Sequence, residues 1–126
     1  MRLAFLGTPA AAVPTLRALV EAGHDVEVVV TRPDRRRGRG GEVSHSPVQL
    51  AAEELGLRVA HSLDGLDALE VERGVVVAYG SLIPAEVLAR VPMLNVHFSL
   101  LPRWRGAAPV ARAILAGDDE TGVSVM

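Results

Sequence analysis

Short runs of apolar residues, many of them β-branched, recur along the chain, and between them apolar residues return every three or four positions. A strand that helices cover on both faces is apolar at nearly every position, so the runs predict strands of a parallel sheet. The intervening segments predict amphipathic helices. The predicted strands comprise residues 3–6, 26–30, 57–60, 74–78 and 93–97, with a sixth that begins at Val123.

Start and stop signals support four helices. Gly23 ends the first helix, and Ser46 and Pro47 are the N-cap and first position of the second. The alternation of strands and helices predicts right-handed βαβ units, and hence an α/β fold with an open, mostly parallel sheet between helical layers. The predicted helices comprise residues 10–21, 47–55, 84–90 and 109–116.

Two stretches follow neither period. Residues 61–73 are acidic and weakly patterned, and we expect one helical turn over 66–69. Residues 31–46 contain four glycines or prolines among five arginines and predict a long loop. Compact domains seldom keep so long a loop without a use for it.

Length and composition describe one folded domain. The chain has 126 residues and no cysteine, which excludes disulfides and thiolate metal sites and fits a reducing, cytoplasmic location. No apolar run is long enough to span a bilayer, and residues 3–6 are too short for a secretion signal. The formal net charge of −2 means that only a local patch could attract nucleic acid.

The arginine-rich loop is such a patch. Its five arginines oppose one aspartate, Asp34, within eight positions, which gives a local charge of about +4. Neighbouring glycines let the arginines adapt to a phosphate backbone, and the absence of aromatic residues there argues against base stacking. The alternative is a solvated surface loop. The candidate phosphate contacts are Arg32, Arg35, Arg36, Arg37 and Arg39.

Asn95 and His97 are the candidate catalytic residues. Residues two apart on a strand point to the same face, so a carboxamide and an imidazole would lie together where the strand at 93–97 ends. Ligands bind at the carboxyl ends of such strands. An amide donor beside a group that titrates near neutral pH suits a reaction that develops an oxyanion. The alternative is a core histidine and a turn-capping asparagine.

Nucleotide-binding fingerprints are missing. Gly7 follows the first strand, but the chain contains neither Gly-x-Gly-x-x-Gly nor Gly-x-x-x-x-Gly-Lys-Ser/Thr. The start of the helix after Thr8 is a modest anion site, and we assign Gly7 to making the turn.

The stretch Asn95-Val96-His97-Phe98-Ser99-Leu100-Leu101-Pro102 resembles the folate-dependent formyltransferases, in which an Asn-x-His pair precedes a Ser-Leu-Leu-Pro loop. The continuation over 103–109 and 116–123 is similar to the members that act on methionine attached to initiator tRNA. Upstream stretches within 5–9, 31–48 and 76–80 match as well. The resemblance covers the whole chain and is weakest between 61 and 73.

The resemblance implies a Rossmann-like domain without a metal. It implies transfer of a formyl group from 10-formyltetrahydrofolate to the α-amino group of methionyl initiator tRNA, in translation initiation. Asn95 and His97 match the catalytic pair, and the arginine-rich loop matches the segment that approaches the tRNA acceptor end. Asn95 can donate to the tetrahedral oxyanion, and His97 can stabilise it or pass a proton. The residues that match the folate site are Ser99, Leu100, Leu101, Pro102, Tyr79 and Gly80.

The chain departs from the family at its C-terminal end. The family uses an aspartate in a Leu-Asp-x-Gly segment shortly after the strand that begins at Val123, whereas this chain ends at Met126. Asp118 and Asp119 lie too early to take that role. We therefore expect residues 1–126 to be a partial N-terminal formyltransferase domain whose sheet is incomplete at the C-terminus, without the family's C-terminal β domain. Alone, it should show weak or no catalysis and low stability.

Two alternatives remain open. A relative that formylates a small amine, such as glycinamide ribonucleotide or an amino sugar nucleotide, would use the same chemistry, although it would not need the arginine-rich loop. A non-catalytic remnant would bind only folate or RNA. No feature of the sequence predicts a membrane or a protein partner.

Overall fold

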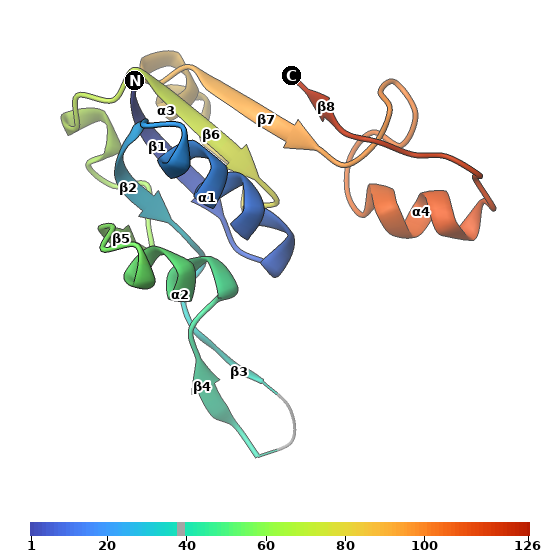
Figure 1. Ribbon diagram of the computed structural model, residues 1–126, viewed down its shortest axis with the longest axis horizontal. Coiled ribbons are helices and arrows are strands. Elements are labelled where there is room, and N and C mark those ends of the chain that lie inside the picture. The colour runs from blue at the N-terminus through green and yellow to red at the C-terminus, as the bar shows by residue number, and fades with distance from the viewer. Residues whose placement is uncertain (38–39) are drawn as a thin grey trace.

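A computed structural model describes residues 1–37 and 40–126 and shows a six-stranded sheet in the order β5-β2-β1-β6-β7-β8 (Figure 1). Neighbouring strands from β5 to β7 are parallel, and β8 runs antiparallel to β7. The chain starts at the centre of the sheet and winds outward to both edges, as in doubly wound folds. The predicted open, mostly parallel α/β sheet is confirmed. The strands are β1 Arg2–Gly7, β2 Asp25–Val30, β5 Val59–Ala60, β6 Arg73–Val77, β7 Met93–His97 and β8 Ser124–Val125.

Helices cover both faces of the sheet, as predicted. One buried cluster joins Leu16 and Val48, on α1 and α2, to Phe5 at the centre of the sheet. The cluster on the other face includes Leu66 and, packed against it, Val87 of α3. The helical segments are η1 Ala10–Ala12, α1 Val13–Glu21, α2 Pro47–Glu54, η2 Leu66–Ala68, α3 Ala85–Arg90 and α4 Pro109–Leu115.

The apolar runs in the sequence correspond to strands that are buried on both sides. In β1, Leu3 and Phe5 pack into the cluster of α1 and α2, whereas Ala4 and Leu6 pack into that of η2 and α3. Phe5, Ala4 and Leu6 are completely buried. Burial of both faces explains why no polar alternation appears in this run.

The predicted starts of α2 and α4 are confirmed, and α3 begins one residue later than predicted, at Ala85. The Ser46 hydroxyl accepts a hydrogen bond of 3.0 Å from the Gln49 N–H, so Ser46 caps α2. The helix predicted over 10–21 begins instead as the short 3-10 turn η1, which closes with a bond from the Val13 N–H to the Ala10 carbonyl. Pro14 has no N–H to donate to that carbonyl, so regular α-helical bonding starts one turn later.

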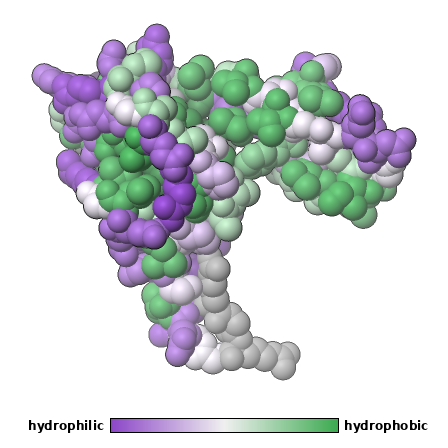
Figure 2. All heavy atoms as spheres, in the orientation of Figure 1, coloured by the Kyte–Doolittle hydropathy of each residue, from purple (hydrophilic) through white to green (hydrophobic). Residues whose placement is uncertain are grey.

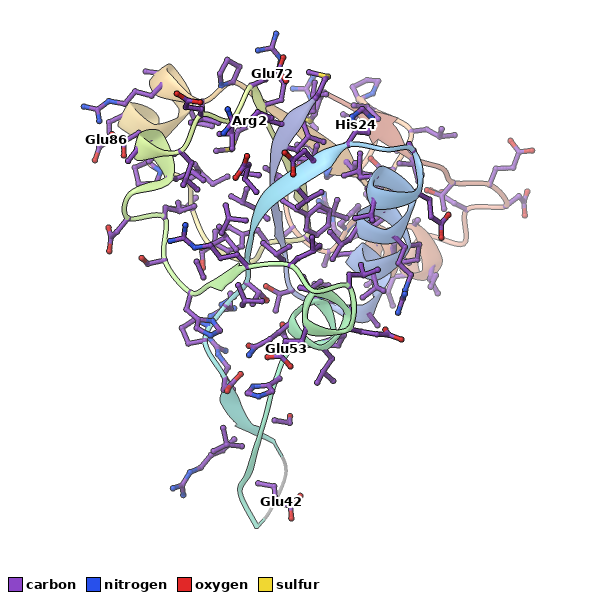
Figure 3. All side chains as sticks on the ribbon, turned by 60° about the vertical axis from the view of Figure 1, so that its left-hand side comes forward. Arg2, His24, Glu42, Glu53, Glu72 and Glu86 are labelled. Carbon is purple, nitrogen blue, oxygen red and sulfur yellow. The ribbon has the colours of Figure 1, made fainter. Side chains whose placement is uncertain are left out.

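The prediction of a continuous loop over residues 31–46 is wrong. Strands β3 Arg35–Arg37 and β4 Glu42–Ser44 form an antiparallel hairpin, which carries Glu42 away from the packed body (Figure 3). All three residues of β4 are exposed. The pairing therefore depends on backbone hydrogen bonds and buries no apolar face, so no hydrophobic pattern marked it. The strand predicted over 57–60 is likewise shorter and consists of Val59–Ala60.

Helix α4 lies to one side of the sheet, next to its edge strand β8 (Figure 1). Apolar side chains of α4 are exposed, as Figure 2 shows, with Ile114 and Leu115 at 72% and 86% exposure. Across residues 1–37 and 40–126, no helix has the length and apolar character required to cross a membrane.

Gly7 ends β1 where the backbone of β6 approaches closely. A Cβ at this position would lie 3.0 Å from the Val77 carbonyl oxygen and 2.9 Å from the Phe5 ring. We expect Gly7→Ala to lower the free energy of unfolding by about 1–3 kcal/mol, because the backbone cannot move aside without disturbing the sheet. Chemical denaturation measures this. Gly74→Ala is the matched control, because the three atoms nearest to its new methyl group all belong to the flexible Met93 side chain and none to the backbone. Equal losses in the two variants would contradict a backbone constraint at Gly7.

Candidate functional site

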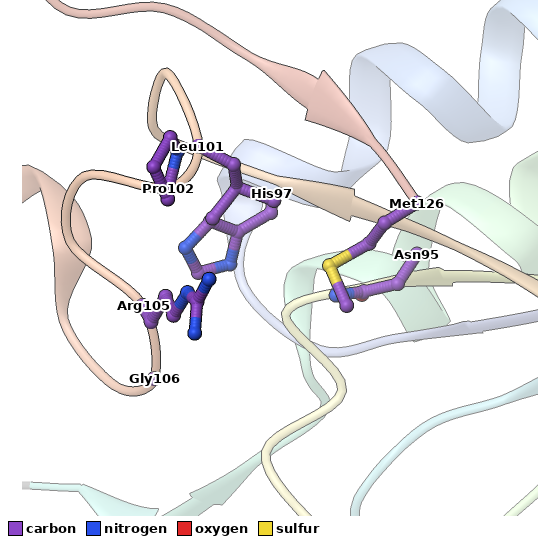
Figure 4. A pocket seen from close by; sticks show the side chains of 7 residues that line it. All are labelled: Asn95, His97, Leu101, Pro102, Arg105, Gly106 and Met126. Atoms are coloured by element: carbon purple, nitrogen blue, oxygen red, sulfur yellow. The ribbon is translucent and has the colours of Figure 1, made fainter.

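Asn95 and His97 lie on the same side of β7. Met93 packs into the cluster of η2 and α3, whereas Val96 packs against that of α1 and α2, so alternate residues face opposite layers. Asn95 and His97 share the side of Met93. Both line one cavity of about 760 Å³ (Figure 4). The structure thus brings the predicted pair together. The other lining residues are Leu101, Pro102, Arg105, Gly106 and Met126.

Met126, which directly follows β8, lines one side of this cavity. The Asn95 N–H donates to the Met126 carbonyl at 2.8 Å, and the Met126 N–H donates back to the Asn95 carbonyl at 3.0 Å. This pairing holds the backbone of Asn95 and brings Met126 to the cavity wall. Within the described residues, no hydrogen bond involves the Asn95 carboxamide, so its N–H groups are available to a ligand.

A backbone carbonyl fixes the proton of the His97 imidazole. His97 Nε2 lies 2.8 Å from the Trp104 carbonyl oxygen. A carbonyl oxygen can only accept, so Nε2–H donates and Nδ1 of the neutral ring carries the lone pair. The neutral ring can therefore accept a proton at Nδ1. Trp104 was not among the predicted site residues, because its contribution comes from the backbone.

Asn95 and His97 also border a second hollow, of about 570 Å³, at the carboxyl ends of β6 and β7. Tyr79 and Gly80 line it together with Asn95 and His97, as expected for neighbouring strand ends. Tyr79 is only 6% exposed and packs in the core, and burial raises the pKa of its hydroxyl. The Thr8 hydroxyl donates to the Tyr79 carbonyl at 2.8 Å, which ties the loop after β1 to the loop after β6.

The four predicted folate contacts after β7 separate into two groups. Leu101 and Pro102 line the cavity of about 760 Å³ together with Asn95 and His97. Ser99 is fully buried, and its hydroxyl donates to the Arg103 carbonyl at 2.6 Å, so it holds the loop together. Leu100 lies beside Gly122, where a Cβ would come within 2.5 Å of its side chain. Ser99 and Leu100 are not among the residues that line this cavity.

Three non-glycine residues around the two hollows have a strained backbone. Ala78, Trp104 and Ala108 have φ angles of 47°, 58° and 51°, in the left-handed region. Ala78 and Ala108 line the second hollow, and Trp104 contacts His97. Non-glycine residues persist in this region only when the surroundings hold them, and such residues gather at functional sites.

A carboxylate outside the cavity holds the loop that contains Trp104. The Arg103 guanidinium donates to both oxygens of Asp118, at 2.9 and 2.6 Å, and the Trp104 indole N–H donates to Oδ2 at 2.6 Å. These hydrogen bonds, first those of Arg103 and then that of Trp104, lower the pKa of Asp118 to about 2. The carboxylate remains ionised above that pH, and the interaction is lost only as the pH falls from about 4 towards that value.

The arginine-rich hairpin stands at the carboxyl ends of β1 and β2. Arg32, Arg35 and Arg36 border a separate cavity of about 310 Å³, together with Thr8 and Ser46. Arg37 belongs to β3, and Arg39 lies outside the described residues. A Cβ at Gly80 would lie 3.2 Å from the Arg32 side chain. Arg32 therefore reaches the rim of the hollow that Asn95 and His97 share.

An ion pair fastens the base of this hairpin. His45 Nδ1 donates to the Asp34 carboxylate at 2.8 Å, and this hydrogen bond raises the pKa of His45. The pair joins the segment before β3 to the residue after β4. Within residues 1–37 and 40–126, no group of three or more histidine, aspartate or glutamate side chains could hold a metal ion.

Comparison with protein families gives one match over the entire chain. A family model described as formyl transferase matches residues 1–126. The methionyl-tRNA formyltransferase of Heliobacterium modesticaldum is 54% identical over 135 residues, covering 100% of this chain and 43% of that protein. That of Dinoroseobacter shibae is 55% identical over 136 residues, covering 100% of this chain and 46% of that protein. The chain spans a little under half the length of these curated relatives.

Solved structures with the same fold are more distant in sequence. Phosphoribosylglycinamide formyltransferase from Bacillus halodurans superposes with a TM-score of 0.74 at 18% identity, covering 99% of this chain and 70% of that chain. Glycinamide ribonucleotide transformylase 1 from Symbiobacterium toebii gives a TM-score of 0.77 at 20% identity, covering 99% and 64%. At these identities the likeness extends to the fold and no further.

Proposed function

The chain belongs to the formyl transferase family, and from that premise we propose that it transfers a formyl group from 10-formyltetrahydrofolate to the α-amino group of methionyl initiator tRNA. The observation that carries this proposal is the placement of Asn95 and His97 in one cavity, with the His97 Nε2–H fixed by Trp104. The full-chain identity of 54% to proteins named methionyl-tRNA formyltransferase supports the choice of acceptor. The reaction belongs in the cytoplasm, which the absence of cysteine fits.

The cavity suits a folate in size and lining. Ligand sites of about 300–1,000 Å³ with mostly apolar walls and a few directed polar groups are typical of small-molecule binding. Here the apolar wall comes from Leu101, Pro102 and Met126, and the polar groups are Asn95, His97 and Arg105. The folate would supply an activated formyl carbon.

The two catalytic candidates have complementary tasks. When the amine attacks, a C–N bond forms and the carbonyl electron pair moves to oxygen, where the Asn95 N–H group donates to the growing negative charge. His97 accepts the proton released by the amine at Nδ1 and returns it to the leaving nitrogen as the old C–N bond breaks. Its Nε2–H bond to Trp104 stabilises the imidazolium formed between these steps.

The hairpin is the proposed contact for tRNA. Arg32, Arg35 and Arg36 are absent from the ion pairs found within the described residues, so their charge is available to phosphate. A small acceptor does not need an arginine-rich segment of this length. Formation of formylmethionyl-tRNA from 10-formyltetrahydrofolate tests the proposal, with glycinamide ribonucleotide as the competing acceptor. Transfer to the ribonucleotide alone would favour the small-amine alternative.

We expect tRNA affinity to fall as pH rises through the range where His45 titrates. Because Asp34 raises the pKa of His45 in the folded hairpin, the ion pair is fully formed below about pH 6.5 and is lost as pH rises through the folded value. Binding at about pH 6 should exceed that at about pH 8 by no more than about fivefold, since the pair is partly exposed. Filter binding at both pH values measures this.

His45→Gln and Asp34→Asn should each flatten this pH dependence. His24→Gln is the control, because His24 lies at the opposite end of the sheet, next to the N-terminal amine. A pH dependence that survives both hairpin substitutions would show that another group is responsible.

A further inference from the structure

We propose that Asp118 is a positioning residue for His97. By holding Arg103 and Trp104 it fixes the carbonyl that accepts the His97 Nε2–H, and so determines which imidazole nitrogen is free for the reaction. The proposal rests on the proposed function only for the chemistry assigned to His97. The linkage between Asp118 and His97 is a matter of structure alone.

Asp118 is held in place by the end of α4. The Asp118 N–H donates to the Ala113 carbonyl and the Gly117 N–H to the Ile114 carbonyl, each at 3.0 Å. Gly117 has a φ angle of 70°. These bonds and the left-handed glycine form a Schellman motif, which gives residue 118 a defined position after the helix.

The Asp118 carboxylate does not stabilise α4, the helix whose end fixes its position. The C-terminal end of a helix favours cations, so an aspartate there is electrostatically unfavourable unless other groups compensate. Compensation comes from the loop after β7, where one guanidinium and one indole N–H bind the carboxylate. The Asp118 side chain is only 14% exposed, so water replaces little of this binding.

Trp104 transmits this anchoring to His97. With a φ angle of 58°, Trp104 adopts a conformation that a non-glycine residue keeps only when it is held. The Arg103 guanidinium lies 4.4 Å from the centre of its ring and that of Arg112 5.2 Å, while the indole N–H binds Asp118. A side chain fastened in this way leaves the Trp104 carbonyl directed at His97 Nε2.

The experiment follows the protons of His97 in the full chain. With isotopically labelled histidine, long-range nuclear magnetic resonance correlations identify the protonated nitrogen, and His97→Gln assigns the signal among the four histidines. We expect the wild type to show a single Nε2–H form whose proton exchanges slowly with water. In Asp118→Asn that exchange should accelerate at least about tenfold, because a bidentate, charge-assisted anchor is replaced by a neutral one.

Matched variants separate positioning from general damage. Asp119→Asn removes the same charge from the next, exposed residue and should leave the His97 signal unchanged. Arg103→Lys keeps the positive charge but loses the bidentate geometry, so it should act in the same direction as Asp118→Asn, and it replaces that variant if the latter does not fold. Asp118→Glu should restore part of the protection of the His97 proton against exchange with water.

In transfer assays, Asp118→Asn should lower kcat at least about tenfold with KM for the acceptor little changed.

Two results would overturn the proposal: unchanged Nε2–H exchange in Asp118→Asn and in Arg103→Lys, or an equal effect in Asp119→Asn. The imidazole signal does not require transfer activity. If the wild type transfers no formyl group but Asp118→Asn still releases the His97 proton, the proposed function fails and the positioning role stands.

Discussion

We expect Asn95→Ala to lower kcat for formyl transfer by about a hundredfold to a thousandfold, equivalent to about 3–4 kcal/mol of transition-state stabilisation. The physical reason is that the carboxamide N–H would meet full negative charge only in the transition state, while the starting formyl oxygen is neutral. KM for the folate should therefore change little. Steady-state rates at saturating tRNA measure the effect.

Leu94→Ala is the matched control for this prediction. Leu94 is the preceding residue of β7, is 45% exposed and points away from Asn95. We expect its transfer rate to remain within about threefold of the wild type, because surface substitutions away from special features have small effects. A similar loss in Leu94→Ala would attribute the effect of Asn95→Ala to damage to the strand.

The second large effect concerns the hairpin. We expect Arg35→Ala combined with Arg36→Ala to weaken tRNA binding by about 10- to 100-fold at about 0.1 M salt, because each phosphate contact contributes about 0.7–0.9 to the salt slope. The slope of log K against log salt concentration should become shallower by about 1.4–1.8. Titrations over a range of salt concentrations measure both quantities.

Arg58→Ala combined with Arg73→Ala removes the same charge elsewhere. Arg58 precedes β5 and Arg73 opens β6 beside Leu3 of β1, and neither residue belongs to the hairpin. We expect this control to leave the salt slope unchanged. A slope that drops equally in both double variants would indicate binding through overall charge and would argue against a dedicated tRNA surface.

The sequence was most informative where burial leaves a direct pattern. Strands β1, β2 and β6 were predictable because apolar residues on both faces leave little alternation, and the start of α2 was predictable because Ser46 and Pro47 act locally. The common side of Asn95 and His97 follows from the two-residue period of a strand. In each case the cause lies within a few residues of the effect.

The remaining features depend on contacts that a local pattern does not encode. The hairpin of β3 and β4 buries no apolar face, so its arginines and glycines resembled a loop. The link from Asp118 to His97 runs through a left-handed Trp104 and a carbonyl, neither of which has a residue signature. From the sequence, Asp118 was not assigned the role of the catalytic aspartate. The structure places it against Trp104, in the loop after β7, and outside the cavity lining. The weak catalysis and the low stability expected of these residues alone both stay predictions.

The most direct test of the account is the single-turnover rate of formyl transfer to methionyl initiator tRNA, with protein in excess. It is measured for the wild type, for Asn95→Ala, for His97→Ala and for the double variant. If both side chains act on the same transition state in one cavity, the double variant should lose about as much rate as the more severe single variant, because residues that act as a unit are not additive. Transfer by the double variant at the wild-type rate would contradict the assignment of the site.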